Sequence, residues 1–150
     1  MPSDDLVNRV RLYVLERTIE TSRAPTAREV AAEVSLPDEL VLEAFRDLAE
    51  RHVYVLEPGD PTRFRMVNPF SAVPTTFVVS VGGRRYFGNC VWDSLGIVSL
   101  LGGEGIVDTS CPDCDEPLSL KVSNHHLVEA DGVVHFAVPA RQWWNDIVFT

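Results

Sequence analysis

The spacing of apolar residues changes along this chain at the stretch NPFSAVPTT, residues 68–76. Before it, as in DDLVNRVRLYVLERTIE at residues 4–20, apolar residues recur every three or four positions, which is the period of an amphipathic helix. After it, short runs such as FVVSV and RRYF flank the glycine pair Gly82-Gly83, a pattern typical of strands joined by a tight turn. The chain is therefore expected to have an α+β fold, helical in front and mainly β behind.

Three helices and a hairpin are predicted in the front half. The second helix begins in APTAREVAAEVSL, where Thr26 and Glu29 have the spacing of a capping box. The third, in SLPDELVLEAFRDLAERH, is expected to turn inward an apolar face made of Val41, Ala44, Phe45 and Leu48. VYVL, the turn EPGDPTR and FRMV then indicate a hairpin. This order predicts a winged-helix-like region over residues 1–67, with a second domain over residues 68–150.

A winged helix raises the question of DNA binding, and the distribution of charge argues against it. The chain has 13 Lys and Arg against 22 Asp and Glu, a formal net charge of -9. The predicted recognition helix, residues 37–52, carries five carboxylates and two arginines, whereas phosphate neutralisation requires Lys or Arg. Nucleic acid is therefore not expected as a partner. A winged-helix regulator stays as a minor alternative, because Arg28, Arg63 and Arg65 are available for backbone contacts.

The sequence also predicts a compartment. No early segment combines basic residues, a long apolar run and a small-residue cleavage site, and no run reaches the length of a membrane span. The three cysteines, Cys90, Cys111 and Cys114, are an odd number in a chain without a visible secretion signal, which favours reduced thiols. We therefore expect a cytoplasmic protein without a membrane partner, in which thiol chemistry or metal binding is a central question.

One cysteine and one aspartate open the apolar run in RRYFGNCVWDSLGIVSLLGGEG. The run predicts a buried helix from Asn89 or Cys90 to about Leu101, ended by the glycine pair that follows. With Asn89 as the cap, Cys90 would lie in the first turn, where free N–H groups and the helix dipole lower a thiol pKa from about 8.5. Asp93 would share its face, about 5–6 Å away at Cβ.

A soft nucleophile beside a group that holds or delivers a proton is a workable catalytic pair. Arg84 and Arg85, on the preceding strand, are expected to add positive potential there. The alternative is that Cys90 is a small buried hydrophobe and Asp93 a simple helix-start carboxylate, and spacing alone slightly favours this alternative.

The wider context of the pair resembles a known family. RRYFGNCVWDSLGIVSLLGGEGIVDTSC resembles the core of the organomercurial (alkylmercury) lyase family, and MVNPFSAVPTTF and RQWWNDIVFT look like sequence of that family too. The resemblance implies protonolysis of a carbon–mercury bond, in which thiolates bind the soft metal. Cys90 would be the attacking thiol and Asp93 the proton donor. The implied partner is a small organometallic substrate or a soft metal ion, with no required cofactor and Hg(II) as bound product.

The resemblance further implies a second catalytic cysteine in a late strand, shortly after the stretch that resembles RQWW…VF. Here that stretch offers Asn145, Asp146 and Thr150 and no cysteine. Either the given sequence ends just before that cysteine or this member lacks it. In the second case the lyase cycle is expected to be impaired unless Cys111 or Cys114 supplies the second thiol. Cys111 matches a further family cysteine, and the role that the resemblance implies for it is structural.

The stretch CPDCDEPL has a C-x-x-C spacing that lets two sulfurs in one turn bind a single metal. A closed zinc site needs four ligands, and a second C-x-x-C is absent from the sequence. Cys90 is then the third sulfur, and His125, His126 and His135 are candidate nitrogens. A non-catalytic binder of Zn(II) or a heavy metal through Cys90, Cys111 and Cys114 is the main alternative to catalysis. A simple turn with one packed and one exposed cysteine is about equally compatible with the spacing.

The remaining features of the back half predict core and edge structure. HLVEADGVVHFAV is expected to form a hairpin around Asp131-Gly132, and WWNDIVF a last strand. Trp92 is expected to anchor its helix in the core. Trp143 and Trp144 are expected either to pack in a core or to cover the mouth of the site.

Overall fold

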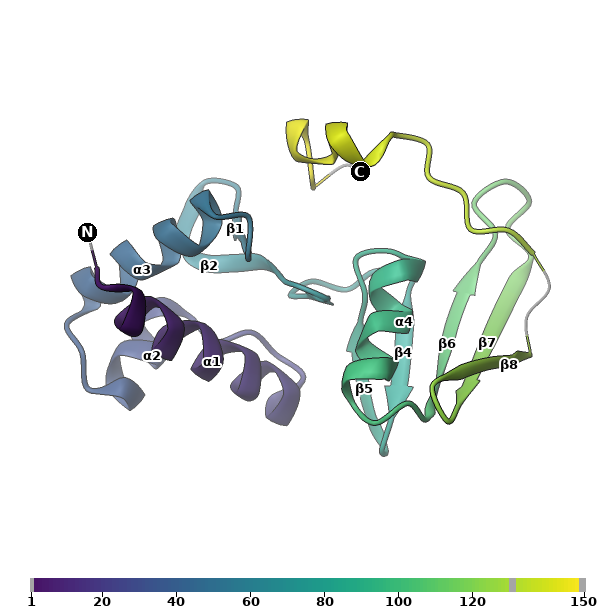
Figure 1. Ribbon diagram of the computed structural model, residues 1–150, viewed down its shortest axis with the longest axis horizontal. Helices are drawn as coiled ribbons and strands as arrows, with labels where there is room; N and C mark the ends of the chain where they lie inside the picture. Colours follow the sequence, from purple (N-terminus) through teal and green to yellow (C-terminus); the bar gives the residue numbers. More distant parts are fainter. Residues whose placement is uncertain (1, 130–131, 149–150) are drawn as a thin grey trace.

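The computed structural model describes residues 2–129 and 132–148, and it has an α+β fold with helices and two antiparallel sheets (Figure 1). The predicted fold class is thereby confirmed at the level of its helices and sheets. Within these residues, no helix combines the length and the apolar character that crossing a bilayer requires.

The front half contains the three predicted helices, α1 (Asp4–Thr21), α2 (Ala27–Val34) and α3 (Asp38–Glu50). The predicted hairpin forms from β1 (Val55–Glu57) and β2 (Asp60–Val67), and a short strand β3 (Phe70–Ser71) pairs with the other side of β2. The inward face predicted for α3 is buried as expected. The core that these elements share consists of Val7, Val10, Val14, Ala27, Val30, Ala31, Val34, Val41, Ala44, Phe45, Leu48, Tyr54, Phe64 and Val67.

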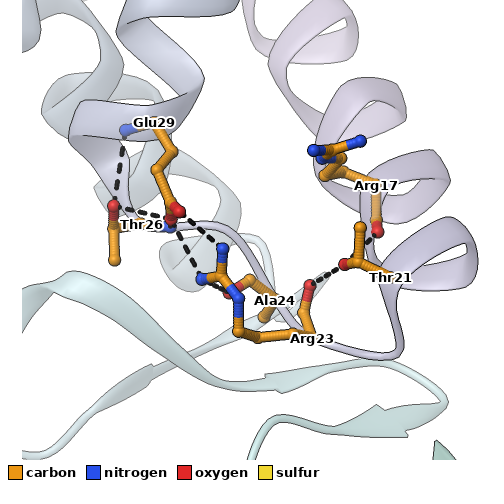
Figure 2. Close-up of polar contacts among 6 residues, drawn as sticks. All are labelled: Arg17, Thr21, Arg23, Ala24, Thr26 and Glu29. Atoms are coloured by element: carbon orange, nitrogen blue, oxygen red, sulfur yellow. Dashed lines mark hydrogen bonds and ion pairs between the residues drawn. The ribbon is translucent and has the colours of Figure 1, made fainter.

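The capping box at the start of α2 is confirmed (Figure 2). The Glu29 N–H donates to the Thr26 hydroxyl at 3.3 Å, and the Thr26 N–H donates to the Glu29 carboxylate at 2.7 Å. Arg23 donates to the same carboxylate at 3.0 Å. Together these donors lower the pKa of Glu29 to about 2, with the Arg23 hydrogen bond as the largest cause. The α1–α2 junction is thus held by a charged group that stays ionised well into the acidic range.

The back half is a five-stranded antiparallel sheet with the order β5-β4-β6-β7-β8 and one helix, α4 (Val91–Leu100). Its strands are β4 (Val78–Val81), β5 (Arg84–Phe87), β6 (Gly105–Ser110), β7 (Pro117–Ser123) and β8 (His126–Glu129). The predicted turn at Gly82-Gly83 joins β4 to β5, and both glycines have positive φ. The second core consists of Phe70, Val79, Tyr86, Ile97, Val98, Val107 and Val122.

Helix α4 buries one face rather than its whole surface. Ser94, Ile97 and Val98 are buried on this helix, whereas Trp92 is 66% exposed. The expectation that Trp92 anchors the helix in the core is therefore wrong. The run predicts a fully buried helix because its residues are apolar on every side. A single helix packed against a single sheet, however, buries only one of its faces.

The two cores meet between residues 67 and 70, next to the predicted boundary. Val67 belongs to the first core and Phe70 to the second. Side chains near the end of α1 also reach the second core, and the Tyr86 hydroxyl donates to the Ile19 carbonyl at 2.8 Å. Phe70 forms an isolated bridge with Gly88, the residue just after β5. Front and back halves are therefore joined by side-chain packing and by backbone pairing.

Of the C-terminal strand predictions, HLVE is confirmed as β8, while the predicted second strand of its hairpin and the last strand at WWNDIVF are wrong. The hairpin that forms joins β7 to β8 through Asn124 and His125, which have φ of 49° and 63°. Gly132 and the residues after it contribute no strand among the described residues, and Asp131 lies outside them. WWNDIVF contributes to a 3₁₀ helix, η1 (Ala140–Asn145), instead of a strand. A short apolar run is compatible with both a strand and a helix. Here the Trp143 indole N–H donates to the Val138 carbonyl at 2.7 Å, and this bond favours the 3₁₀ helix.

Candidate active site

Strand directions bring Cys90 and the CPDC stretch to one edge of the five-stranded sheet. Strands β5 and β6 both run antiparallel to β4, so their carboxyl ends lie at the same edge. Cys90 follows β5 and Cys111 follows β6. Because β4 lies between them, the two chain segments are separated by two strand spacings, about 10 Å. We call this edge, formed by residues 88–93 and 111–116, the cysteine edge.

The link from β5 into α4 is closely packed. The Gly88 N–H donates to the Phe77 carbonyl at 3.0 Å, and the Thr75 hydroxyl donates to the Gly88 carbonyl at 2.7 Å. A Cβ at Gly88 would clash with the Ser94 hydroxyl. That hydroxyl donates to the Cys90 carbonyl at 2.7 Å. Glycine is thus needed at residue 88 for the chain to pass α4 closely enough to place Cys90.

Cys90 is the N-cap of α4, so the helix begins one residue later than expected with Asn89 as the cap. Its backbone is extended, with φ of -151° and ψ of -179°, and its side chain makes no capping hydrogen bond. The side chain is partly buried. The thiol therefore lies at the opening of the helix rather than inside its first turn.

The expectation of a lowered thiol pKa at Cys90 is wrong. Burial raises the pKa of Cys90, and the negative charge of Asp93 raises it further. The backbone N–H groups of Asp93 and Trp92 lower it but do not compensate, and their approach falls short of capping geometry. Burial in an apolar setting disfavours the thiolate more than a few N–H dipoles favour it.

Asp93 lies beside the thiol, as its spacing predicts. Burial raises the pKa of the Asp93 carboxyl, while the Asn89 amide and the Cys90 thiol lower it through hydrogen bonds. The Asn89 amide donates to the carboxyl at 3.0 Å and makes a longer contact of 3.4 Å with the Pro69 carbonyl. A carboxyl with a raised pKa beside a thiol holds a proton at higher pH than a free aspartate does.

Asn89 is a residue whose role the sequence analysis missed. The sequence pattern predicts that Asn89 caps the helix, but its amide instead orients the Asp93 carboxyl from four positions upstream. The spacing of Asn89 and Asp93 is the available signal, because an amide and a carboxyl four residues apart meet when a helix begins between them.

Arg84 and Arg85 do not add positive potential at the cysteine edge, contrary to expectation. Both lie at the start of β5, at the end of the strand far from Gly88. Arg84 donates to the Glu20 carbonyl of α1, and Arg85 is exposed opposite Ser80. The four-residue length of β5 takes their Cα atoms away from the thiol.

Aromatic side chains of the C-terminal segment lie near the start of α4. The ring centroids of Trp92 and Phe136 are 6.5 Å apart, and those of Phe136 and Trp143 are 5.2 Å apart. Trp144 stacks on His52 of the front half, with centroids 3.9 Å apart. The segment thus runs from the sheet across to the front half, above the N-terminal end of α4 (Figure 1). Trp143 is thus linked to the start of α4 through Phe136 and Trp92, and its role as a cover for the mouth of the site stays a prediction.

The CPDC stretch closes a tight turn between β6 and β7. The Asp115 N–H donates to the Cys111 carbonyl, and the Cys111 N–H donates to the Glu116 carbonyl, both at 2.9 Å. Hydrogen bonds from the Asp113 and Cys114 backbone, and from the Cys114 side chain, lower the pKa of Cys111. Cys114 is exposed and Cys111 partly buried, which matches the expected turn with one cysteine more open than the other.

Across residues 2–129 and 132–148, no group of three or more His, Cys, Asp or Glu side chains is arranged to hold a metal. The proposed ligand set of Cys90, Cys111 and Cys114 therefore does not converge in this structure. His125 lies in the β7–β8 turn, at the edge of the sheet opposite to the cysteine edge, where its N–H donates to the Gly103 carbonyl at 3.1 Å. A four-ligand zinc centre has no support from these positions.

Comparison with protein-family models matches residues 70–150 to the alkylmercury lyase family, MerB. The matched segment covers more than half of the chain. The chain belongs to the alkylmercury lyase family. The resemblance drawn from the sequence is thereby confirmed. The match begins at Phe70, the first residue of the second core, and includes Cys90, Asp93 and the CPDC turn.

A solved structure of MerB2 in its mercury-bound form shares this fold, with a TM-score of 0.65 and 22% sequence identity. The likeness covers 85% of this chain and 60% of that one, so the chain spans about three fifths of the length of this neighbour. Since it covers more of this chain than the family match does, it includes part of the helical front half. Comparison with curated proteins found no match.

Proposed function

We propose that this protein is an organomercurial lyase, which cleaves carbon–mercury bonds by protonolysis with Cys90 as the mercury-binding thiol and Asp93 as the proton donor. The observation that carries the proposal is the pairing of this thiol and this carboxyl at the start of α4, within the segment that matches the family. The placement of Asn89 on the Asp93 carboxyl adds to it, because it fixes the acid next to the sulfur.

The first step is ligand exchange on mercury. Cys90 binds the mercury of R–Hg–X through sulfur, X leaves as an anion, and the thiol proton is released. The raised pKa of Cys90 does not prevent this step, since a soft metal ion displaces the proton as it binds. The Asp93 carboxyl is the nearest described acid–base group to the sulfur and accepts that proton.

The second step is transfer of a proton to carbon. Asp93 gives its proton to the carbon attached to mercury, the electron pair of the C–Hg bond becomes the new C–H bond, and the hydrocarbon leaves. Asp93 ends as a carboxylate, and Hg(II) stays on Cys90. The raised pKa of Asp93 suits this role, because a carboxyl with a higher pKa holds the proton taken from the thiol until the carbon accepts it. Mercury is substrate and product here, and the step needs no resident cofactor.

A second thiol on mercury assists such a cleavage by weakening the carbon–metal bond. Cys111 and Cys114 follow β6, about two strand spacings from the segment that holds Cys90. We therefore propose that added low-molecular-weight thiol supplies this second ligand during turnover by the 150-residue chain. The rate of hydrocarbon release is then expected to rise with thiol concentration.

The test is hydrocarbon release from a simple arylmercury or alkylmercury salt, measured by gas chromatography in the presence of added thiol. Cys90→Ser is expected to lower the rate by about a thousandfold or more, because the bond to mercury is lost. Ser99→Ala, at an exposed position near the other end of α4, is the matched control and is expected to keep the rate. Equal turnover by Cys90→Ser and the unmodified protein would refute the assignment. Retention of mercury without hydrocarbon would favour a non-catalytic heavy-metal binder instead.

We propose that the front half is a winged-helix-like scaffold and that the protein works in the cytoplasm. The acidic side chains of α3 and the pairing of two arginines support a scaffold over a DNA reader: Arg63 lies 3.7 Å from Asp60, and Arg65 lies 3.6 Å from Glu57. Free cysteines at residues 90, 111 and 114 support a reducing compartment. Salt-dependent binding to duplex DNA would contradict the scaffold role.

A further inference from the structure

The proposed lyase site uses Cys90 and leaves the other two cysteines without a role. Cys111 and Cys114 lie in one turn, where the i→i+4 bond from the Asp115 N–H to the Cys111 carbonyl folds the chain back on itself. The Cys111 N–H also donates to the Glu116 carbonyl at 2.9 Å, so both cysteines belong to one closed turn. Cys114 is exposed, so an ion in solution reaches the pair without rearrangement of the core.

The surroundings of this pair favour a cation. Asp113, Asp115 and Glu116 are exposed in the same turn, and residues 111–116 contain no Lys or Arg. Negative charge at this density attracts a cation electrostatically, although salt screens it at an exposed site.

The number of ligands decides which kind of ion fits. A structural zinc site needs four ligands, and the described residues provide no third or fourth group around this pair. Two thiolates complete the coordination of a soft ion that prefers two sulfurs in a linear arrangement, as Hg(II) does. The turn therefore matches a two-coordinate thiophilic ion and fails to match zinc.

We propose that Cys111 and Cys114 form a second metal site, a dithiolate chelate for a soft two-coordinate ion such as Hg(II), separate from Cys90. On binding a mercuric salt HgX₂, two Hg–S bonds form, two thiol protons are released and both X anions leave, with no change of oxidation state. The site lies on the cysteine edge beside the proposed lyase centre, and it is suited to hold the ion which that centre releases. The inference that the ion comes from the lyase centre rests on the proposed function, whereas the inference that the two cysteines bind such an ion does not.

The experiment measures mercury retention in a background that cannot carry out the lyase reaction. Cys90→Ser leaves Cys111 and Cys114 as the remaining thiols of the full chain. The reduced variant is loaded with mercuric chloride, exposed to excess glutathione and desalted, and its mercury is counted by elemental analysis. We expect one mercury per chain to be retained, because two linked thiolates compete with a monothiol far better than one does.

The matched controls are Cys90→Ser combined with Cys111→Ser, and Cys90→Ser combined with Cys114→Ser. Each keeps a single thiol and is expected to bind mercury about a hundredfold or more weakly under the same competition. Cys114 is exposed, so its replacement by serine leaves the fold intact, which thermal unfolding checks. Equal retention by the single-thiol variants, or equal retention of Zn(II) when zinc chloride replaces mercuric chloride, would overturn the proposal. Hydrocarbon release by the unmodified chain is a separate measurement, so failure of the lyase function and failure of the chelate are distinguishable.

Discussion

Cys90 and Cys111 follow strands that end at the same edge of one sheet, yet their surroundings shift the thiol pKa in opposite directions. Cys90 is held at the start of α4, where burial and the charge of Asp93 raise the pKa of its thiol. Cys111 lies in a turn, where backbone N–H groups and the Cys114 thiol lower the pKa of its sulfur. The difference teaches that a helix start does not by itself make a reactive thiolate. Solvent access and the neighbouring charge decide the balance.

The two thiols are therefore suited to different tasks. A protonated thiol next to a carboxyl suits proton transfer coupled to metal binding, since both partners in the exchange lie side by side. A thiol with a lowered pKa next to an exposed second thiol suits chelation. Three substitutions and one labelling experiment test this contrast, and they are taken from the largest expected effect to the smallest.

Asp93→Asn removes the proposed proton donor and the charge that raises the pKa of Cys90. Hydrocarbon release is expected to fall by about a hundred- to ten-thousandfold, which is the usual contribution of a general acid. Mercury binding at Cys90 should persist, because its sulfur is intact. The measurements are hydrocarbon by gas chromatography and bound mercury after desalting. Loss of both activities together would indicate that Asp93 supports the fold of the site rather than the proton transfer.

Alkylation by iodoacetamide compares the two thiols directly. At neutral pH Cys111 is expected to react about tenfold or more faster than Cys90, because the thiolate is the nucleophile and the two pKa values are shifted apart. Peptide mass spectrometry of a time course separates the sites. The rate at Cys90 should rise in Asp93→Asn while the rate at Cys111 stays constant. Faster labelling of Cys90 than of Cys111 in the unmodified protein would reverse the comparison.

Asn89→Ala removes the 3.0 Å hydrogen bond to the Asp93 carboxyl. That bond favours the carboxylate and lowers the pKa of Asp93, so its loss is expected to raise this pKa further. The protonated acid then persists to higher pH, and the alkaline limb of the pH–rate profile should shift upward by up to about one unit, with a several-fold lower maximal rate. Asn89→Gln is the conservative comparison. An unshifted limb would exclude Asn89 as the positioning residue for this acid.

Glu29→Gln tests whether a remote charge alters the comparison of the two thiols. The Arg23 hydrogen bond and the Thr26 N–H lower the pKa of Glu29 to about 2, so this group stabilises the fold above its unfolded pKa and loses that effect as pH falls from about 4.5 towards 2. The substitution is expected to cost about 0.5 kcal/mol at neutral pH, since the group is largely solvent-screened. Urea unfolding at neutral and acidic pH measures the cost. Alkylation rates at both cysteines should not change.

Local patterns in the sequence predict the front half well. The helices, the capping box at Thr26 and the buried face of α3 follow from hydrophobic period and from capping chemistry, which act over three or four residues. The glycine turn before β5 is predicted for the same reason. Patterns at the C-terminal end were less informative, because a short apolar run such as WWNDIVF is compatible with a strand and with a turn of helix.

The sequence predicts that Cys90 and Asp93 lie side by side, but it does not predict the electrostatics around them. Spacing places Cys90 and Asp93 together, and the family match over residues 70–150 includes both residues. The direction of the Cys90 pKa shift, the placement of Arg84 and Arg85 at the far end of β5, and the exposure of Trp92 were predicted wrongly. Each depends on burial or on long-range pairing, which a local pattern does not contain.

The sequence by itself determined the class of fold, the family and the pairing of a thiol with an acid one helical turn away. The fold class and the thiol–acid pairing follow from spacings of two to four residues and from the order of elements along the chain, whereas the family follows from the resemblance of whole stretches of sequence. The tertiary structure alone decided that β5 and β6 end at one edge, so that Cys90 and the CPDC turn lie on the same side of the sheet. It also decided that burial beside a carboxyl raises the pKa of Cys90, while backbone N–H groups and the Cys114 thiol lower that of Cys111, because solvation and hydrogen bonding depend on how distant segments pack around a residue.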